Sequence, residues 1–282
     1  MPSFDTPAPI SATAHVEAGS IQFTATDRPD TVVEVRPRNP EKDVDVRAAA
    51  QTEVTCVGGA LTVRTPKGGL LGLGRTGTVD VTVELPTGSR VDVSGAWAHV
   101  LGEGRLGEVR VKTSTGDVRF DETGPLRLKA SHGSIAVDRV EGAAEITTSS
   151  GGLRVGFVDG PAVLKNSHGA TTVGAVTGEL RVNGAHGDID IARAGDSVTA
   201  TTAHGALRVG EVIRGTVQLE TAYGTIEVGV RAGTAAWLDV HAGSGQVRNT
   251  LAASEAPRET EDIVKIRART RYGNVDVRRA RA

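Results

Sequence analysis

The sequence has few cysteines and few aromatic residues, and both scarcities exclude particular architectures. Cys56 is the single cysteine among 282 residues, so an internal disulfide framework, a zinc site built on several cysteines and a CxxC redox pair are all excluded. Phe, Tyr and Trp together make up only 3% of the chain, so the interior must be built from Val, Leu, Ile and Ala. A lone free thiol is typical of the cytosol, where thiols stay reduced.

Long apolar runs and an excess of charge of one sign are also missing. No 18 consecutive residues are apolar, so we expect no membrane-spanning helix. The segment Met1–Thr6 has no basic stretch and no apolar run follows it, which predicts that there is no secretory signal. The net charge of −2 argues against a general affinity for nucleic acid or anionic lipid. We therefore expect a soluble, cytoplasmic protein.

Glycine, in contrast, is abundant at 36 residues, and it marks a repeat of about 18 residues. Apolar residues stand two and four positions after each turn glycine and five and seven positions before it, with polar residues between them. Alternation of this kind is typical of a strand with one buried face. Each repeat therefore predicts a strand, a tight turn, a second strand and a second turn. The turn glycines are Gly116, Gly133, Gly151, Gly169, Gly187, Gly205, Gly224, Gly245 and Gly273.

A two-stranded repeat of this length cannot bury its apolar face alone, but copies stacked ~4.8 Å apart can. The sequence therefore predicts an all-β protein, a single-stranded β-solenoid (β-helix) of about ten coils over residues 87–282, with an insertion near 250–262. Residues 1–86 are expected to form an irregular β-strand cap with a Gly-rich loop at 67–77. One consequence is that Leu128, Ile146, Leu164 and Val182 should lie in single file inside the solenoid.

Several segments resemble a family of bacterial β-strand-repeat domains named "putative adhesin". The resemblance is carried by the turn segments 113–118, 149–153 and 185–189, and by a lead-in strand, 81–88, that ends in Leu-Pro. It covers residues 12–277 and implies a β-solenoid, with no catalytic residues to transfer. Bactofilins, cytoskeletal β-helices of similar coil length, are a second resemblance.

The slot just before the turn glycine holds ring side chains on many coils. His132, His168, His186 and His204 occupy it, and Tyr223 and Tyr272 follow on later coils. Stacked coils should place such residues in a column with ~4.8 Å between backbones. A column presents its ligands in a line, so we predict no metal site and no cofactor, with His168, His186 and His204 as the alternative metal ligands. A partner-binding edge and a ladder without a ligand remain open, and Trp97 and Trp237 are placed off this column.

Two further segments have features that are typical of anion binding. Gly69–Thr76 has the spacing of a phosphate-binding loop, but an alternating strand follows where that chemistry needs a helix, so we expect a plain Gly-rich loop. Residues 263–282 carry a cluster of arginines, which predicts a basic last coil that discourages end-to-end strand pairing. Arg267, Arg269 and Arg271 are its candidate contacts to an acidic surface, and the shortage of aromatic residues argues against specific nucleic-acid binding.

No reactive constellation emerges from the sequence. It has no clustered carboxylates, no G-x-S-x-G elbow and no calcium-binding nonapeptide. The leading interpretation is a non-enzymatic, rigid β-solenoid that binds or scaffolds a protein partner. A carbohydrate-binding or carbohydrate-processing β-helix and a bactofilin-like filament-forming scaffold are the alternatives.

Overall fold

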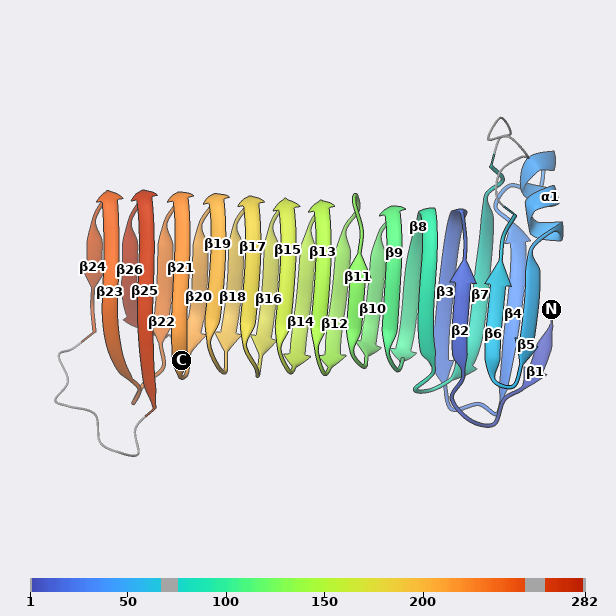
Figure 1. Ribbon diagram of the computed structural model, residues 1–282, viewed down its shortest axis with the longest axis horizontal. Coiled ribbons are helices and arrows are strands. Elements are labelled where there is room, and N and C mark those ends of the chain that lie inside the picture. The colour runs from blue at the N-terminus through green and yellow to red at the C-terminus, as the bar shows by residue number, and fades with distance from the viewer. Residues whose placement is uncertain (1, 67–75, 252–261, 281–282) are drawn as a thin grey trace. The chain divides into compact units, whose positions relative to one another are not determined.

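The computed structural model describes residues 2–66, 76–251 and 262–280, which fall into two compact units. Unit 1 comprises residues 1–141 and unit 2 residues 142–282. Both consist almost entirely of β-strands (Figure 1), which confirms the predicted fold class. Within the described segments no helix has the length and apolarity needed to cross a membrane. Most of the Gly-rich loop and of the predicted insertion, residues 67–75 and 252–261, lies outside the described residues.

The regular part of unit 2 is a stack of rungs, each made of two strands joined by a turn. Every strand pairs in parallel with its counterpart in the next rung. The first strands are β13 (Ala144–Ser150), β15 (Ala162–His168), β17 (Leu180–His186), β19 (Val198–His204) and β21 (Gly215–Tyr223). The second strands are β14 (Leu153–Asp159), β16 (Thr171–Val176), β18 (Ile189–Ala194), β20 (Leu207–Val212) and β22 (Ile226–Val230).

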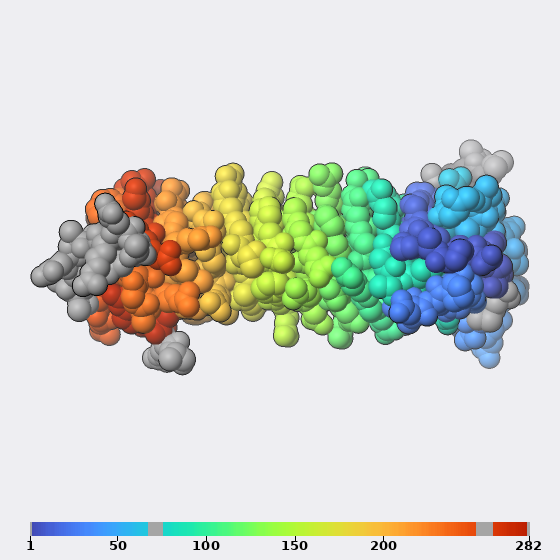
Figure 2. Space-filling view, turned by 90° about the horizontal axis from the view of Figure 1, so that it is seen from below, coloured from blue at the N-terminus to red at the C-terminus, as the bar shows by residue number. Residues whose placement is uncertain are grey.

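Register in this stack follows the apolar alternation. Ile146 lies opposite Leu164 and Leu164 opposite Val182, and all three side chains are fully buried. The predicted single file is therefore confirmed within unit 2, whereas Leu128 belongs to unit 1 and pairs there with Val111. The outward side chains of successive rungs form parallel ridges on the visible face of unit 2 (Figure 2).

Turn glycines are required by the close approach of neighbouring rungs. Gly187 has a φ of +138°, and a Cβ there would lie 2.2 Å from the carbonyl oxygen of Gly169 in the previous rung. Residues other than glycine are strained at positive φ. The turn glycines therefore mark the positions at which the turn of one rung contacts the turn of the next.

At the C-terminal end of unit 2, the order of rungs departs from the order of the sequence. Strands β25 (Ile263–Tyr272) and β26 (Val275–Arg279) lie between β21 and β22 on one side and β23 (Ala235–Ser244) and β24 (Val247–Asn249) on the other (Figure 1). The expectation that the basic segment forms the end of the stack is therefore wrong. Among the described residues of unit 2, the outermost rung at this end is β23–β24.

The two strands are buried to different degrees in this arrangement. The inward residues of β25 include Val264 and Ile266, which are fully buried between two neighbouring strands. The corresponding residues of β23, Ala236 and Leu238, are only half-buried. The inward set of β23, Ala236, Leu238 and Val240, is about as apolar as that of β25, so the difference in burial follows from the position of each strand in the stack.

Unit 1 contains a second rung that is out of sequence order. The long strand β8 (Arg90–Arg105) pairs on one side with β9 (Val109–Thr115) and β10 (Val118–Thr123), and the rung of β11 (Leu126–Lys129) and β12 (Ile135–Glu141) follows. On its other side it pairs with β2 (Ser11–His15) and β3 (Ala18–Thr26). Beyond these lie β6 (Ala60–Arg64) and β7 (Val79–Pro86). Residues 11–26, expected in an irregular cap, therefore form a regular rung in parallel register.

Antiparallel strands end the parallel stack in unit 1. β4 (Asp30–Pro37) pairs antiparallel with β7, β5 (Glu53–Val57) with β6, and β1 (Ser3–Asp5) with β4. Between β4 and β5 lies a helix that the alternation did not predict, α1 (Asp43–Ala50), which packs against β4 and β7. Its Asp45 is buried and accepts hydrogen bonds from the backbone N–H groups of Asn39 and Thr78.

Candidate functional site

A column of five stacked rings stands on the turn edge of unit 2. Adjacent ring centroids are 4.9–5.0 Å apart and the ring planes differ by only 3–6°. All five side chains are exposed, and the stacking predicted for the histidines is confirmed. We call this set the aromatic column: His168, His186, His204, Tyr223 and Tyr272.

The last ring of the column depends on the exchanged rungs. Tyr223 lies in register with Tyr272 of β25, and Tyr272 lies in register with Ser244 of β23. If the rungs followed the order of the chain, Tyr223 would face Ser244 and the column would end there. Enclosure of β25 therefore extends the column by one ring.

Inward polar side chains hold the turns that carry the column. The Thr221 hydroxyl donates to the carbonyl oxygen of Gly205 at 3.1 Å, and the Thr270 hydroxyl donates to that of Gly224 at 3.0 Å. Each bond joins one rung to the turn of its neighbour. Sequence reasoning missed this row, although its signal was present as a polar residue two positions before the ring.

Asn166 has the same position in the rung next to a gap in this row. Its amide nitrogen donates to the carbonyl oxygens of Gly151 at 3.0 Å and Gly169 at 3.2 Å. Gly184 follows Asn166 in register and offers no side chain, and a Cβ there would have only ordinary contacts at 3.4–3.6 Å. The row is therefore interrupted at a position that has room for a side chain.

One carboxylate links two histidine-bearing turns. Asp188 directly follows the turn glycine of the His186 rung, and it accepts a hydrogen bond from the backbone N–H of Ala206 at 2.8 Å and one from Arg208 at 3.1 Å. The Ala206 N–H chiefly, and the Arg208 guanidinium next, hold the pKa of Asp188 below its ordinary value. The ionised carboxylate therefore ties the His186 turn to the His204 rung.

The column does not have the geometry of a metal centre. Its rings are parallel and follow one another in a line, whereas a zinc site needs three or four ligands around one point. In the part of the chain that the structure describes, no group of three or more His, Cys, Asp or Glu side chains could hold a metal ion. The arrangement presents ring edges, with imidazole nitrogens and phenol oxygens, to the surroundings.

Unit 1 has a corresponding slot with different occupants. His132 bridges in parallel to Thr115, and Thr115 lies in register with Trp97. Trp97 was expected off the slot, and this was wrong because Ala98 takes the place of the turn glycine in that rung. The Trp97 side chain is 61% exposed.

The predicted basic contacts are engaged within unit 2. The guanidinium groups of Arg267 and Arg269 lie 3.0 and 3.5 Å from the Asp239 carboxylate of the outermost rung. Arg279 donates to the carbonyl oxygens of Arg231 and Thr234, both at 2.9 Å. Arg267 and Arg269 therefore link the outermost rung to β25, and Arg279 links the segment before that rung to β26, while Arg271 stands exposed on β25.

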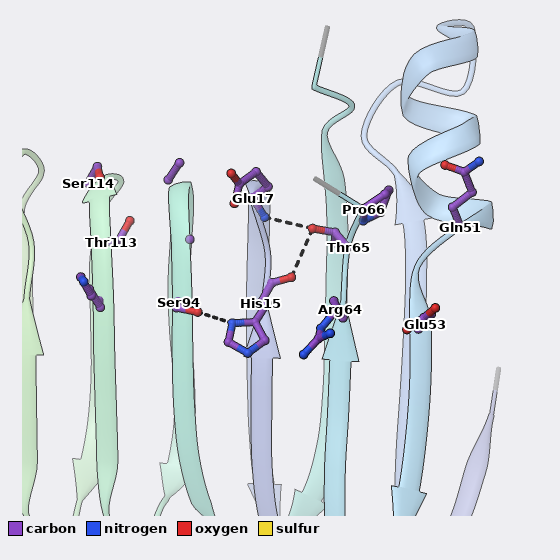
Figure 3. A pocket seen from close by; sticks show the side chains of 13 residues that line it. His15, Glu17, Gln51, Glu53, Arg64, Thr65, Pro66, Ser94, Thr113 and Ser114 are labelled. Atoms are coloured by element: carbon purple, nitrogen blue, oxygen red, sulfur yellow. Dashed lines mark hydrogen bonds between the residues drawn. The ribbon is translucent and has the colours of Figure 1, made fainter. Parts of the chain in front are cut away.

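Unit 1 has a pocket of about 830 Å³ that sequence reasoning did not find. His15, Arg64, Thr65, Ser94 and Lys112 are among the residues that line it (Figure 3). The Thr65 hydroxyl donates to the carbonyl oxygen of His15 and accepts from the backbone N–H of Glu17, and His15 Nδ1 shares a hydrogen bond with the Ser94 hydroxyl. These residues come from distant segments that only the rung exchange in unit 1 brings together.

Comparisons with known proteins give one family match and several similar crystal structures. The family Toastrack DUF4097 matches residues 15–279. Crystal structures described as putative adhesins are similar to this chain. That from Parabacteroides merdae is 16% identical with a TM-score of 0.44, covering 80% of this chain and 94% of its own. That from Bacteroides fragilis is 13% identical with a TM-score of 0.36, covering 98% of this chain and 95% of its own.

A comparison with curated proteins gives no match. The family match spans nearly the whole chain and includes β3 of unit 1 and β25 and β26 of unit 2. The chain belongs to the Toastrack DUF4097 family of β-solenoid domains.

Proposed function

We propose that this protein is a non-enzymatic binding module that contacts a protein partner through the aromatic column of unit 2. The stacked, exposed rings carry this proposal. Aromatic side chains are enriched at protein interfaces, because they supply contact area at a low cost in conformational entropy. Here the main-chain register and the Thr221 and Thr270 hydrogen bonds fix the rings before any partner arrives.

The orientation of the rings favours a protein over a carbohydrate. Sugars stack on the flat faces of aromatic rings, but each inner ring of the column has its faces covered by its neighbours. What remains accessible is a line of ring edges that carry hydrogen-bonding atoms. Such an edge suits the backbone and polar side chains of a protein.

The proposal is tested by comparing three forms of the full chain as immobilised bait in lysate of the native cells. One is unchanged, one carries His186→Ser, His204→Ser and Tyr223→Ser, and the matched control carries Arg154→Ser, Lys165→Ser and Thr172→Ser at exposed strand positions. We expect the unchanged chain and the control to retain the same protein, and the column variant to lose it. Retention by all three forms, or by none, would contradict the proposal, provided that circular dichroism shows all three folded.

One observation favours self-assembly as a second candidate function. The outermost rung of unit 2 pairs on one side only among the described residues, and the basic strand expected to block end-to-end pairing lies beneath it. An unpaired edge is a template for another strand. Electron microscopy at high protein concentration would show filaments if this candidate is correct, and separate particles if it is not.

A further inference from the structure

The outer face of one sheet in unit 1 concentrates positive charge. Residues 1–141 carry 16 Lys and Arg against 19 Asp and Glu, so the unit as a whole is acidic. At the outward positions of β2, β6, β9, β11 and residues 90–96 of β8, however, Asp92 is the one acidic side chain. The cations at those positions are Arg64, Arg90, Arg110, Lys112, Arg127 and Lys129.

Three of these cations lie in one register row that crosses the strands. Arg64 pairs with His15, His15 with Ser94, Ser94 with Lys112, and Lys112 with Lys129. With ~4.8 Å between strands, the row extends roughly 19 Å. We call these five residues the basic row. Four of them, all except Lys129, line the 830 Å³ pocket (Figure 3).

The cations of the row are not neutralised by their neighbours. Arg90 and Arg110, which lie outside the row, share the carboxylate of Glu108. Within the described parts of unit 1, Arg64, Lys112 and Lys129 form no ion pair. Glu17 and Glu53 also line the pocket, but neither lies within ion-pair distance of the row. Glu53 lies opposite Arg64 in register on β5, but the row still presents three positive charges without an ion pair on one face of an acidic unit.

We propose that the basic row binds an extended acidic peptide that runs across the strands of unit 1. Alternate side chains of an extended peptide recur on one face about every 6.7 Å, so about seven residues would place four carboxylates along the row, at roughly 0, 7, 13 and 20 Å. With ~4.8 Å between strands, Arg64, Lys112 and Lys129 stand at roughly 0, 14 and 19 Å, so the first, third and fourth carboxylates each meet a cation. The second carboxylate lies between His15 and Ser94, which offer hydrogen bonds. Nucleic acid fits less well, because the basic row itself contains no Phe, Tyr or Trp for base stacking and the rest of the unit repels a long polyanion.

This inference is independent of the aromatic column, since it concerns other side chains in the other unit. Its test is fluorescence anisotropy of the full chain with a labelled peptide of alternating Glu and Ser, with the same peptide carrying Gln for Glu as the control probe. The test variant carries Arg64→Gln, Lys112→Gln and Lys129→Gln. A matched variant of equal net charge carries Arg38→Gln, Arg47→Gln and Arg119→Gln, none of which belongs to the row.

We expect the Glu peptide to bind the unchanged chain and the matched variant alike, and the row variant about tenfold more weakly, since exposed ion pairs contribute modestly but add over three sites. Binding should weaken as salt is added. Equal affinity for the Gln peptide, equal loss in both variants or no loss in either would overturn the proposal. Stronger binding of an oligonucleotide or a polyuronate than of the peptide would overturn the choice of partner.

Discussion

In each unit, the rung nearest to the chain terminus in sequence, β2–β3 in unit 1 and β25–β26 in unit 2, is enclosed in the stack. The strands that cover it come from nearer the middle of the sequence. In unit 1, β2 and β3 lie beneath β6 and β7, which are covered in turn by the antiparallel strands β4 and β5. In unit 2, β25 and β26 lie beneath β23 and β24 alone. The comparison shows that a terminal rung can be enclosed without an antiparallel cap. Among the described strands, only in unit 1, where antiparallel strands are present, is the last parallel rung covered on its outer side.

The largest expected effect comes from replacing inward side chains with alanine, in the enclosed rungs and in the outermost rung. Ile21 of β3 and Ile266 of β25 are fully buried, so Ile21→Ala and Ile266→Ala should each lower the free energy of unfolding by about 2–5 kcal/mol. Leu238 of β23 is only half-buried, so Leu238→Ala should cost about 1 kcal/mol. Urea unfolding of the three variants measures this. A larger decrease in the free energy of unfolding for Leu238→Ala than for Ile266→Ala would contradict the comparison, because it would mean that β23 is the enclosed strand.

A second prediction contrasts a glycine of the regular stack with one beside the outermost rung. Gly187 and Gly233 both have positive φ, but a Cβ would meet the Gly169 carbonyl at 2.2 Å in the first case and nothing within 4 Å in the second. Gly233→Ala should therefore cost only the backbone strain, about 1 kcal/mol, and Gly187→Ala about 2–3 kcal/mol. Thermal unfolding of both variants tests this, and equal costs would show that the turns are not in contact.

Within the regular stack, one substitution should raise stability. The position of Gly184 has no positive φ and room for a Cβ at 3.4–3.6 Å, so Gly184→Ala should stabilise unit 2 by about 0.5–1 kcal/mol through the entropy of the unfolded chain. Its measurement is the midpoint of urea unfolding. A destabilised variant would mean that the interrupted polar row needs the empty space.

The smallest expected effect concerns pH. The pKa of Asp188 is lowered in the folded protein, so its ionised form stabilises the fold at pH values above its ordinary pKa, and this contribution is lost as the pH falls through the folded value. Asp188→Asn should therefore be less stable than the unchanged chain at pH 7 by only about 0.5 kcal/mol, since the group is partly exposed. The two proteins should begin to converge below the ordinary pKa of about 3.9 and should be equally stable once the pH lies below the lower pKa of the folded protein. A difference that persists unchanged at low pH would contradict the assignment.

The sequence predicts the rungs well but not their order. Alternation identifies Ile266 and Ala268 as inward residues, and they are buried. It cannot tell which strand lies beside β21, because the inward residues of β23 and β25 both fit that neighbour. The choice depends on the burial of both strands together, which is a property of the assembled stack.

Because the repeat does not give the order of the rungs, the sequence predicts only those contacts of the candidate sites that lie between rungs in sequence order. The histidines of the aromatic column share one slot at a constant spacing, so their stacking followed from the repeat. Tyr272 joins the column only through the exchange of rungs, and His15 and Arg64 meet only because residues 11–26 form a rung between β6 and β8. Contacts across an exchanged rung leave no periodic signal in the sequence.

Disulfide trapping tests the exchanged order in unit 2 most directly. With Cys56→Ser as the background, one variant carries Gln218→Cys and Arg267→Cys, which lie in register on adjacent strands, and a second carries Gln218→Cys and Asp239→Cys, which lie two strands apart. Disulfides need Cα atoms within about 7 Å, whereas two strand spacings amount to ~9.6 Å. We predict that mild oxidation cross-links the first pair and leaves the second reduced. Cross-linking of the second pair in place of the first would contradict the rung order and the five-ring column that depends on it.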